Sequence, residues 1–283
     1  MPDPLTLMTV HAHPDDEAIG TGGILARYSD EGLQTVLVTC TGGEVGEIAD
    51  PTLAAPENLA EVRKRELLAA CEILGVGRLH LLGYRDSGMA GTPDNDHPDS
   101  FNKANLDEAT GKLVALVRRE RPQVLVTYDE NGFYGHPDHI NANRITVAAF
   151  GAAADAARYP EAGPPWQPLK FYYTAIPRSG IATFGKLMRE AGIEPPFEEA
   201  PEGVEPPFGT PDELVTTYVD VSAQLERKRR ALLAHATQMG PETFFMKIPE
   251  PIFNVIFGLE TFQLVKSLVP VPEQEDDLFA GLR

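Results

Sequence analysis

The sequence predicts an α/β protein built on a mostly parallel β-sheet with helices on both faces. The first 160 residues alternate short runs rich in apolar and β-branched residues with longer segments of helical periodicity. Such alternation favours parallel strands, because each parallel pair needs a crossover connection that is usually a helix. The second observation is the composition, in which 42% of the 283 residues are hydrophobic. That share is enough to bury a substantial core.

The expected elements follow from the pattern in chain order. Short apolar strands are predicted over residues 5–10, 35–40, 78–82 and 124–128. Helices are predicted over residues 18–31, 57–74, 105–121 and 137–157. Gly32 and Gly75 stand directly after two of these helices, where glycine commonly ends a helix. We therefore assign residues 1–160 to a core domain that carries the site.

Residues 161–283 are expected to form a smaller C-terminal subdomain or cap. Strands are predicted over residues 170–175 and 214–221, and a closing helix over residues 223–237. Between them, a proline-rich stretch over residues 195–211 has the texture of a variable cap. The pattern gives no placement for residues 240–283.

Charge and composition narrow the classes of partner. A formal net charge of −18 opposes binding to nucleic acid or to an anionic membrane, so a neutral or weakly charged small molecule fits better. No apolar run approaches the roughly 20 residues that span a bilayer, and the N-terminal residues lack a secretory pattern. These features predict a cytoplasmic protein and are compatible with a homo-oligomer. Cys40 and Cys71 are expected to be reduced core thiols.

A cluster of potential metal ligands follows the first predicted strand, where the chain reads His11-Ala-His13-Pro-Asp15-Asp16-Glu17. In an open parallel sheet, ligands bind beyond the carboxyl ends of the strands, so this is where a site is expected. The proline ends the strand, and the two aspartates open the next helix pointing in different directions. An Asp pair at a helix start is by itself a common cap worth about 1 kcal/mol. The functional interpretation therefore depends on a second cluster.

That second cluster follows the fourth predicted strand and reads His136-Pro-Asp138-His139. A glycine-bearing loop precedes it, and Pro137 suits the first turn of a helix. His136 and His139 are three residues apart and share a helix face, whereas Asp138 turns aside to contact a neighbour. Because parallel strands end at the same edge of a sheet, the two clusters are expected to meet.

Two histidines and one carboxylate with an open fourth position form a familiar catalytic zinc site. We assign the metal ligands to His13, Asp16 and His139. Zn²⁺ is the expected ion, and Fe²⁺ is the alternative.

The neighbouring residues supply candidate acid–base groups. Asp15 lies beside a ligand but is directed elsewhere, so it is placed to act as general base and to return the proton to a departing amine. His136, held by Asp138 and protonated, would stabilise the oxyanion of the reaction. His11 is equally well explained as a support for the ligands or as a packed strand residue, and it receives no catalytic role.

Together the two motifs resemble the PIG-L/LmbE-like family of zinc-dependent N-acetylglucosaminyl deacetylases. Their order and separation make the match specific. The resemblance implies a Rossmann-like core and a hydrolase that cleaves the linear amide of an amino sugar, releasing acetate and a free amine. The family's ligand, base and oxyanion roles fall on the residues assigned above.

Within that family the chain is similar, over most of its length, to the enzymes of mycothiol metabolism. These are the N-acetylglucosaminyl-inositol deacetylase and the mycothiol S-conjugate amidase. The segment Arg85-Asp86-Ser-Gly-Met-Ala-Gly-Thr92 favours the deacetylase, whereas Glu242-Thr-Phe-Phe245 favours the amidase, so both branches stay open. Further matching segments are Thr41-Gly-Gly-Glu44-Val-Gly-Glu47 and His235-Ala-Thr-Gln238.

The same resemblance implies contacts with the substrate. Arg63 and Asp86 would bind hydroxyls of the sugar or inositol, Glu47 would lie near the site, and Tyr134 would sit over the metal. From the sequence alone each signal is weak, since an Arg on a charged helix usually faces solvent.

Two other classes of metal protein are alternatives. Two histidines and one carboxylate also form the facial triad of non-haem iron oxygenases, although Asp15 and the α/β pattern favour hydrolysis. A non-catalytic metal protein would need a closed shell of four protein ligands, and the motifs provide three.

A dinucleotide-binding module is the remaining alternative. Gly20, Gly22 and Gly23 follow the first strand, but the required glycines belong in the turn itself. Here that turn holds Pro14 and two aspartates, which would repel a pyrophosphate.

Overall fold

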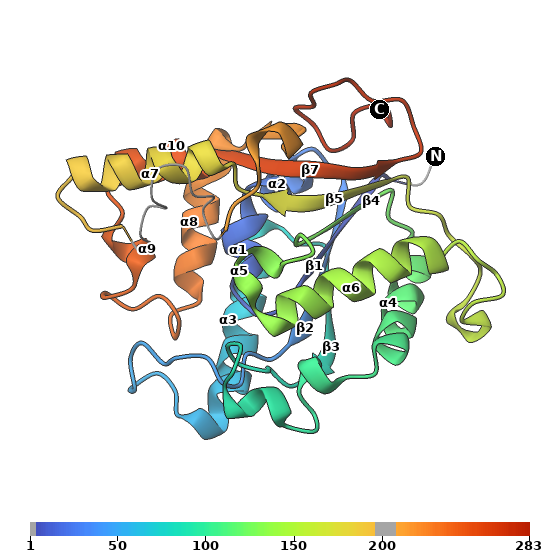
Figure 1. Cartoon of the computed structure of the whole chain (residues 1–283), viewed down its shortest axis with the longest axis horizontal. Coiled ribbons are helices and arrows are strands. Elements are labelled where there is room, and N and C mark those ends of the chain that lie inside the picture. Colours follow the sequence, from blue (N-terminus) through green and yellow to red (C-terminus); the bar gives the residue numbers. More distant parts are fainter. Residues whose placement is uncertain (1–3, 196–207) are drawn as a thin grey trace.

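A single seven-stranded sheet runs through the residues that the computed structural model describes, 4–195 and 208–283 (Figure 1). Its strand order is β3-β2-β1-β4-β5-β7-β6. The first five strands in this order are parallel, and β7 runs antiparallel to both of its neighbours. The strands are β1 Thr6–His11, β2 Gln34–Thr41, β3 Arg78–Tyr84, β4 Val124–Thr127, β5 Lys170–Ala175, β6 Thr217–Asp220 and β7 Leu259–Ser267. The predicted α/β class with a mostly parallel sheet is confirmed.

Helices cover both faces of this sheet (Figure 1). On one face, α4 (Leu106–Glu120) and α6 (Pro137–Ala152) pack on the strands through one apolar cluster. On the other face, α2 (Gly22–Asp30), α3 (Leu59–Leu74) and α8 (Leu225–Ala234) contribute to a second cluster. With both faces covered, β1 and β4 are buried along their whole length, as their continuous apolar runs require.

The predicted helix over residues 18–31 is two helices, α1 (Asp16–Gly20) and α2, which break at Thr21. The Thr21 hydroxyl bonds the ring of His11 (2.8 Å) and so turns toward the first strand. The amides of Gly23 and Ile24 begin the second helix, and both donate to the carboxylate of Glu260 (2.7 and 2.8 Å). This break depends on a partner 237 residues away, which the local pattern does not reveal.

The predicted helix over residues 137–157 was too long, because α6 ends at Ala152. The cause is Arg118 of α4, which is buried. Its guanidinium donates hydrogen bonds to backbone carbonyls at the end of α6 and in the segment that follows. These are the carbonyls of Ala152, Ala153, Asp155, Arg158, Tyr159 and Gly163. The α4 helix itself matches its prediction, with Asn105 capping the amides of its first turn.

The C-terminal part continues the same sheet, since β5 pairs with β4 and β7 pairs with β5. The predicted strand over residues 214–221 is shorter and forms β6, and the predicted helix over residues 223–237 contains α8. The unplaced tail supplies the short helices α9 (Phe244–Lys247) and α10 (Glu250–Phe257) and the strand β7. The helix α7 (Arg178–Glu190) was not predicted, and it contacts α10 beside the sheet (Figure 1). Most of the proline-rich stretch, residues 196–207, lies outside the described residues.

Short helical turns complete the architecture at α5 (Gly132–Gly135), Pro56–Asn58, Pro93–Asp96, Phe101–Lys103, Pro160–Ala162, Asp212–Leu214 and Ser222–Gln224. Both cysteines are free and buried, as expected. Across the two described ranges, none of the helices combines the length and the apolar character needed to cross a bilayer.

Candidate metal centre

The two predicted clusters meet at one edge of the sheet. Because β1 and β4 are neighbouring parallel strands, the segments that follow them leave the sheet side by side. Asp16 Oδ2 lies 3.4 Å from His13 Nδ1 and 3.5 Å from His139 Nε2. One nitrogen from each of His13, His136 and His139 lies within 4.8 Å of the others, and all three rings are buried. The convergence expected of these distant segments is therefore present.

Within the described residues, His139 has the burial, charge state and unpaired nitrogens that suit a metal ligand. Neither of its ring nitrogens has a hydrogen-bond partner among the described residues, although both are buried. Burial lowers the pKa of His139 to about 3, so the ring is neutral. Buried polar atoms are normally paired, and a neutral imidazole with a free lone pair is the form that ligates metal. The residues present thus fit a bound metal ion.

The charge around His13 also favours a cation. Asp138 Oδ2 lies 3.2 Å and Asp86 Oδ1 3.5 Å from His13 Nε2, and Asp16 lies at the other ring nitrogen. Burial opposes protonation, but these carboxylates raise the pKa of His13 well above its usual range. An environment that attracts a proton this strongly would also stabilise a metal ion.

A second group of ligand atoms overlaps the first, formed by His13, Asp86, His136 and Asp138 within 4.8 Å of one another. The two groups share His13 and His136 and differ in their other members, which are His139 in the first group and the two carboxylates in the second. If Nε2–H donates to Asp138, Nδ1 is left for a cation on the side of Asp16. The first group also contains His139, whose nitrogens have no other partner in the part of the chain that is described. Neither group contains Asp16 among the described residues, so the assignment of the ligands to His13, Asp16 and His139 stays a prediction.

Asp15 has a strained backbone and a perturbed carboxyl. Its φ is 112°, a conformation that costs a residue with a side chain about 1–3 kcal/mol. Its N–H donates to Glu17 Oε2 (3.0 Å), and its Oδ2 accepts from Arg63 (3.0 Å). Burial raises the pKa of Asp15 to about 6, and the positive charge of Arg63 limits the rise. Strain and a shifted pKa at one residue are typical of functional sites.

The residues predicted to contact substrate differ in how deeply they are buried, and Arg63 and Asp86 are the buried ones. Arg63 is buried and donates to the carbonyls of Gly43 (2.9 Å) and Pro14 (2.5 Å) as well as to Asp15. It therefore braces the loop that carries the candidate base, and a substrate contact from it stays a prediction. Asp86 is also buried and faces His13 rather than solvent.

Tyr134 and Glu47 are more accessible. The Tyr134 ring is 46% exposed, and its centroid lies 5.1 Å from that of His139 and 6.1 Å from that of His136. This places Tyr134 at the rim of the ligand cluster. The Glu47 side chain is exposed on the loop after β2, and its backbone carbonyl accepts from Gln238 (3.0 Å).

Asp138 does not hold His136 in the way the sequence suggested. Its carboxylate accepts from the backbone and hydroxyl of Ser87 and contacts His13, while only its backbone N–H reaches His136 Nδ1 (3.1 Å). That N–H makes Nδ1 an acceptor, so the proton of neutral His136 sits on Nε2. Burial and the neighbouring His13 lower the pKa of His136. In this arrangement His136 is a neutral Nε2–H donor, and its catalytic role stays a prediction.

Two supporting residues were missed by sequence reasoning. The Tyr128 hydroxyl donates to Asp16 Oδ2 (2.7 Å), and its ring stacks on His139 with centroids 4.1 Å apart. Ser87 holds both oxygens of Asp138. A tyrosine at a strand end looks like any packed aromatic, and only the matching segment around Arg85 pointed toward Ser87. His11, bonded to Thr21 and near the Tyr128 hydroxyl, is a support residue.

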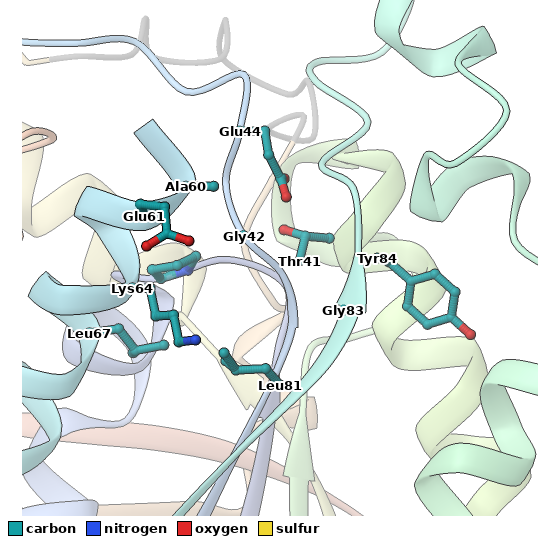
Figure 2. A pocket seen from close by; sticks show the side chains of 11 residues that line it. Thr41, Gly42, Glu44, Ala60, Glu61, Lys64, Leu67, Leu81, Gly83 and Tyr84 are labelled. Carbon is teal, nitrogen blue, oxygen red and sulfur yellow. The ribbon is translucent and has the colours of Figure 1, made fainter. Parts of the chain in front are cut away.

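A small pocket of about 160 Å³ lies between α3, the loop after β2 and the end of β3 (Figure 2). Glu61 and Lys64 of α3, the loop after β2 and the end of β3 line it, and the predicted metal ligands do not. Glu44 connects the pocket with the centre, because its carboxylate accepts the backbone N–H of Asp86 (2.8 Å). The loops after β2 and β3 are thereby tied together, which holds Asp86 toward His13.

Comparison with known proteins gives one consistent picture. A family model described as PIG-L, GlcNAc-PI de-N-acetylase, matches residues 8–150. A protein of Geodermatophilus obscurus named 1D-myo-inositol 2-acetamido-2-deoxy-alpha-D-glucopyranoside deacetylase is 46% identical over 286 residues, covering 98% of this chain and 97% of the relative. The mycothiol S-conjugate amidase of Streptomyces coelicolor is 42% identical over 292 residues, covering 100% and 99%.

Solved structures agree on the fold. The N,N'-diacetylchitobiose deacetylase of Pyrococcus horikoshii superposes with a TM-score of 0.65 at 20% identity, covering 93% of this chain and 84% of that chain. A conserved protein of Thermus thermophilus gives a TM-score of 0.59 at 26% identity, covering 95% and 98%.

Proposed function

This chain belongs to the PIG-L family of GlcNAc-PI de-N-acetylases, and we propose that it is a zinc-dependent amidohydrolase acting on an N-acetylglucosaminyl-inositol. The products would be acetate and the free amine of the sugar. One observation carries the proposal: a candidate base with a raised pKa stands directly beside a buried cluster of His and Asp ligands. The relatives that match nearly the whole chain support the same reaction class.

His13, Asp16 and His139 would hold the metal ion, with Fe²⁺ as the alternative to Zn²⁺. Zinc bound there would lower the pKa of a water molecule and polarise the carbonyl of the substrate amide. The Tyr128 hydroxyl holds Asp16 in place by a hydrogen bond. Asp138 orients the His13 ring by accepting a hydrogen bond from the Nε2–H of His13. Such outer contacts fix the direction and basicity of metal ligands.

Asp15 would be the general base. Its carboxyl has a pKa raised to about 6, so at neutral pH it is ionised and ready to accept a proton from the attacking water. Once protonated it is a competent acid, because the same pKa lets it release the proton to the leaving amine. Arg63 holds the carboxylate from one side and keeps it directed during both steps.

His136 would stabilise the developing oxyanion as a neutral donor. The backbone N–H of Asp138 occupies Nδ1 and leaves Nε2–H as the free donor of the ring. A fixed donor needs no change of charge during the reaction, so this arrangement replaces the imidazolium expected from the sequence.

The substrate would enter past Tyr134, which lies at the rim of the centre. We assign contacts with sugar or inositol hydroxyls to Arg63 and Asp86, and a place near the substrate to Glu47. Asp86 is the strongest of these assignments, because its carboxylate already lies within the ligand cluster.

The mycothiol S-conjugate amidase reaction is the second candidate, favoured by the relative from Streptomyces coelicolor that spans the whole chain. Both reactions break a linear amide next to the same amino sugar, so one centre serves either. The difference lies in the acyl group, which is small in one substrate and large in the other.

An amine-release assay with zinc-loaded protein tests both candidates. The substrates are N-acetylglucosaminyl-inositol, a thiol conjugate of mycothiol and plain N-acetylglucosamine, with Asp15→Ala as the inactive control. We expect the first to have the highest kcat/KM. A higher value for the conjugate would assign the chain to the amidase branch, and absence of zinc-dependent amine release from all three would refute the proposed function.

A further inference from the structure

The segment His235–Gln238, which follows α8, reaches the catalytic edge from the far end of the chain. His235 Nε2 lies 2.7 Å from Glu17 Oε1, and both side chains are fully buried. His235 does not belong to either group of candidate metal ligands found in the described part of the chain. Its contact with the last residue of the first motif therefore calls for a role other than metal binding.

Glu17 connects His235 with the candidate base. One carboxylate oxygen meets His235, and the other accepts the backbone N–H of Asp15 (3.0 Å). That N–H belongs to the residue with φ of 112°. A hydrogen bond of this kind compensates a conformation that a residue with a side chain otherwise avoids. Arg63 fixes the carboxyl of the same residue, so Asp15 is held at both ends.

The segment that carries His235 is itself fixed to the catalytic edge. The backbone N–H and hydroxyl of Thr237 both donate to Glu66 of α3 (2.8 and 2.7 Å). The Thr237 carbonyl accepts from Ala49 (2.8 Å), and Gln238 donates to the carbonyl of Glu47. A mobile segment would not define the position of Glu17, whereas this one is anchored to a helix and to the loop after β2.

We infer that His235 is a positioning residue, which acts through Glu17 to hold Asp15 in the strained conformation that aims its carboxylate at the reacting centre. This inference rests on the proposed function only in treating Asp15 as the base. Glu17 and the segment His235–Gln238 have no part in binding metal, accepting the proton or stabilising the oxyanion. The inference gives them the task of positioning Asp15.

The first test compares steady-state kinetics of His235→Leu and His235→Gln. Leucine removes the donor to Glu17, so kcat should fall about 100-fold, as expected for a misplaced catalytic group. KM should change little, because the substrate contacts are elsewhere, and metal analysis should still find the zinc bound. Glutamine places an amide donor near the position of Nε2 and should restore most of kcat.

Lys228→Met is the matched control. Lys228 also lies on α8 and forms a buried ion pair, with Glu260 at 2.5 Å, but this pair supports α2 and does not touch Asp15. We expect this variant to lose thermal stability and keep kcat. Equal losses of kcat in Lys228→Met and His235→Leu would show that His235 has only a structural role. The same conclusion would follow if His235→Gln did not restore kcat.

A crystal structure of zinc-loaded His235→Leu separates this inference from the proposed function. We expect Asp15 to relax to a negative φ while the ligands stay in place. Retention of the positive φ would refute the positioning role, even if the enzyme acts on another amide. A wild-type protein that hydrolyses none of the amides would refute the proposed function alone.

Discussion

The C-terminal tail and the candidate metal centre both bury charged groups, and they do so in opposite ways. Under the C-terminal tail, Lys170 pairs with Glu275 with both side chains fully buried. Tyr172 and Thr217 also donate to that carboxylate (2.9 and 3.0 Å), and Lys170 reaches the carbonyl of Ala280 (3.0 Å). Every charge in this seam has partners from several elements, so the group serves to join strands and tail.

The metal centre is equally buried but incompletely paired. The ring nitrogens of His139 have no hydrogen-bond partner within the described residues, and Asp15 keeps a strained backbone. The comparison teaches that burial of polar residues does not identify a functional site by itself. What distinguishes the centre is the unfilled hydrogen-bonding capacity, which a bound ion and a substrate would complete.

The sharpest test of this contrast is His139→Ala. The variant loses a proposed ligand whose ring makes no hydrogen bond within the described fold, so we expect zinc occupancy and turnover to fall to background while the metal-free protein stays folded. Metal analysis, the amine-release assay and circular dichroism check the three parts. Full zinc occupancy in the folded variant would remove His139 from the ligand set. His13→Ala should likewise lose both metal and turnover.

Asp15→Ala should separate metal binding from chemistry. The substitution removes the candidate base and leaves the three ligands, so zinc content should persist while kcat falls about 10²–10⁴-fold. The pair of measurements is zinc content and kcat on the same preparation. A variant with wild-type kcat would show that another group accepts the proton.

Lys170→Met tests the fully paired region. Removing one partner leaves Glu275 buried without its counter-charge, which typically costs about 3–5 kcal/mol of folding stability. Urea unfolding should show this loss, whereas zinc content and kcat should match the wild type under conditions where the variant is folded. A selective loss of kcat with unchanged stability would contradict the division between the two regions.

His136→Ala should have a smaller effect than Asp15→Ala. It removes the proposed hydrogen-bond donor to the oxyanion, worth about 10²–10³-fold in kcat, and should lower turnover more than zinc occupancy. Competition with a zinc chelator measures the affinity beside the kinetics. The reverse outcome would exchange the roles of His136 and His139.

The smallest predicted effect concerns acid stability of the tail. Burial by itself would raise the pKa of Asp277. Hydrogen bonds from the Phe279 N–H, Arg283 and Tyr28 outweigh burial and lower this pKa. A carboxyl with a depressed folded-state pKa adds stability that is complete above its unfolded pKa and is lost as pH falls through the folded value. Asp277→Asn should therefore lose less Tm than the wild type between about pH 5 and pH 3. Parallel Tm curves for the two proteins would disprove this contribution.

The sequence was most informative where the chemistry is local. Both motifs stand directly after strands that the apolar pattern predicts, so their meeting at one edge of the sheet was predictable. The strand 170–175 was predicted with its bounds, because aromatic residues with high strand propensity fill its centre.

What escaped prediction depends on partners far along the chain. The break at Thr21 needs Glu260, and the early end of α6 needs Arg118. Asp138 was assigned to the wrong neighbour because its side chain meets Ser87, 51 residues earlier, and no local pattern reports such a pair. The strand β7 lacked a signal because its neighbours in the sheet come from other parts of the chain.

The position of β7 has a consequence for how the protein is made. Because β7 covers the edge of β5, a nascent chain that ends before residue 259 already holds every candidate ligand but leaves the edge of β5 uncovered. An uncovered parallel edge invites pairing with other chains. We expect such a fragment to aggregate during translation unless a chaperone shields it, so the ribosome must finish nearly the whole polypeptide before the catalytic edge can mature.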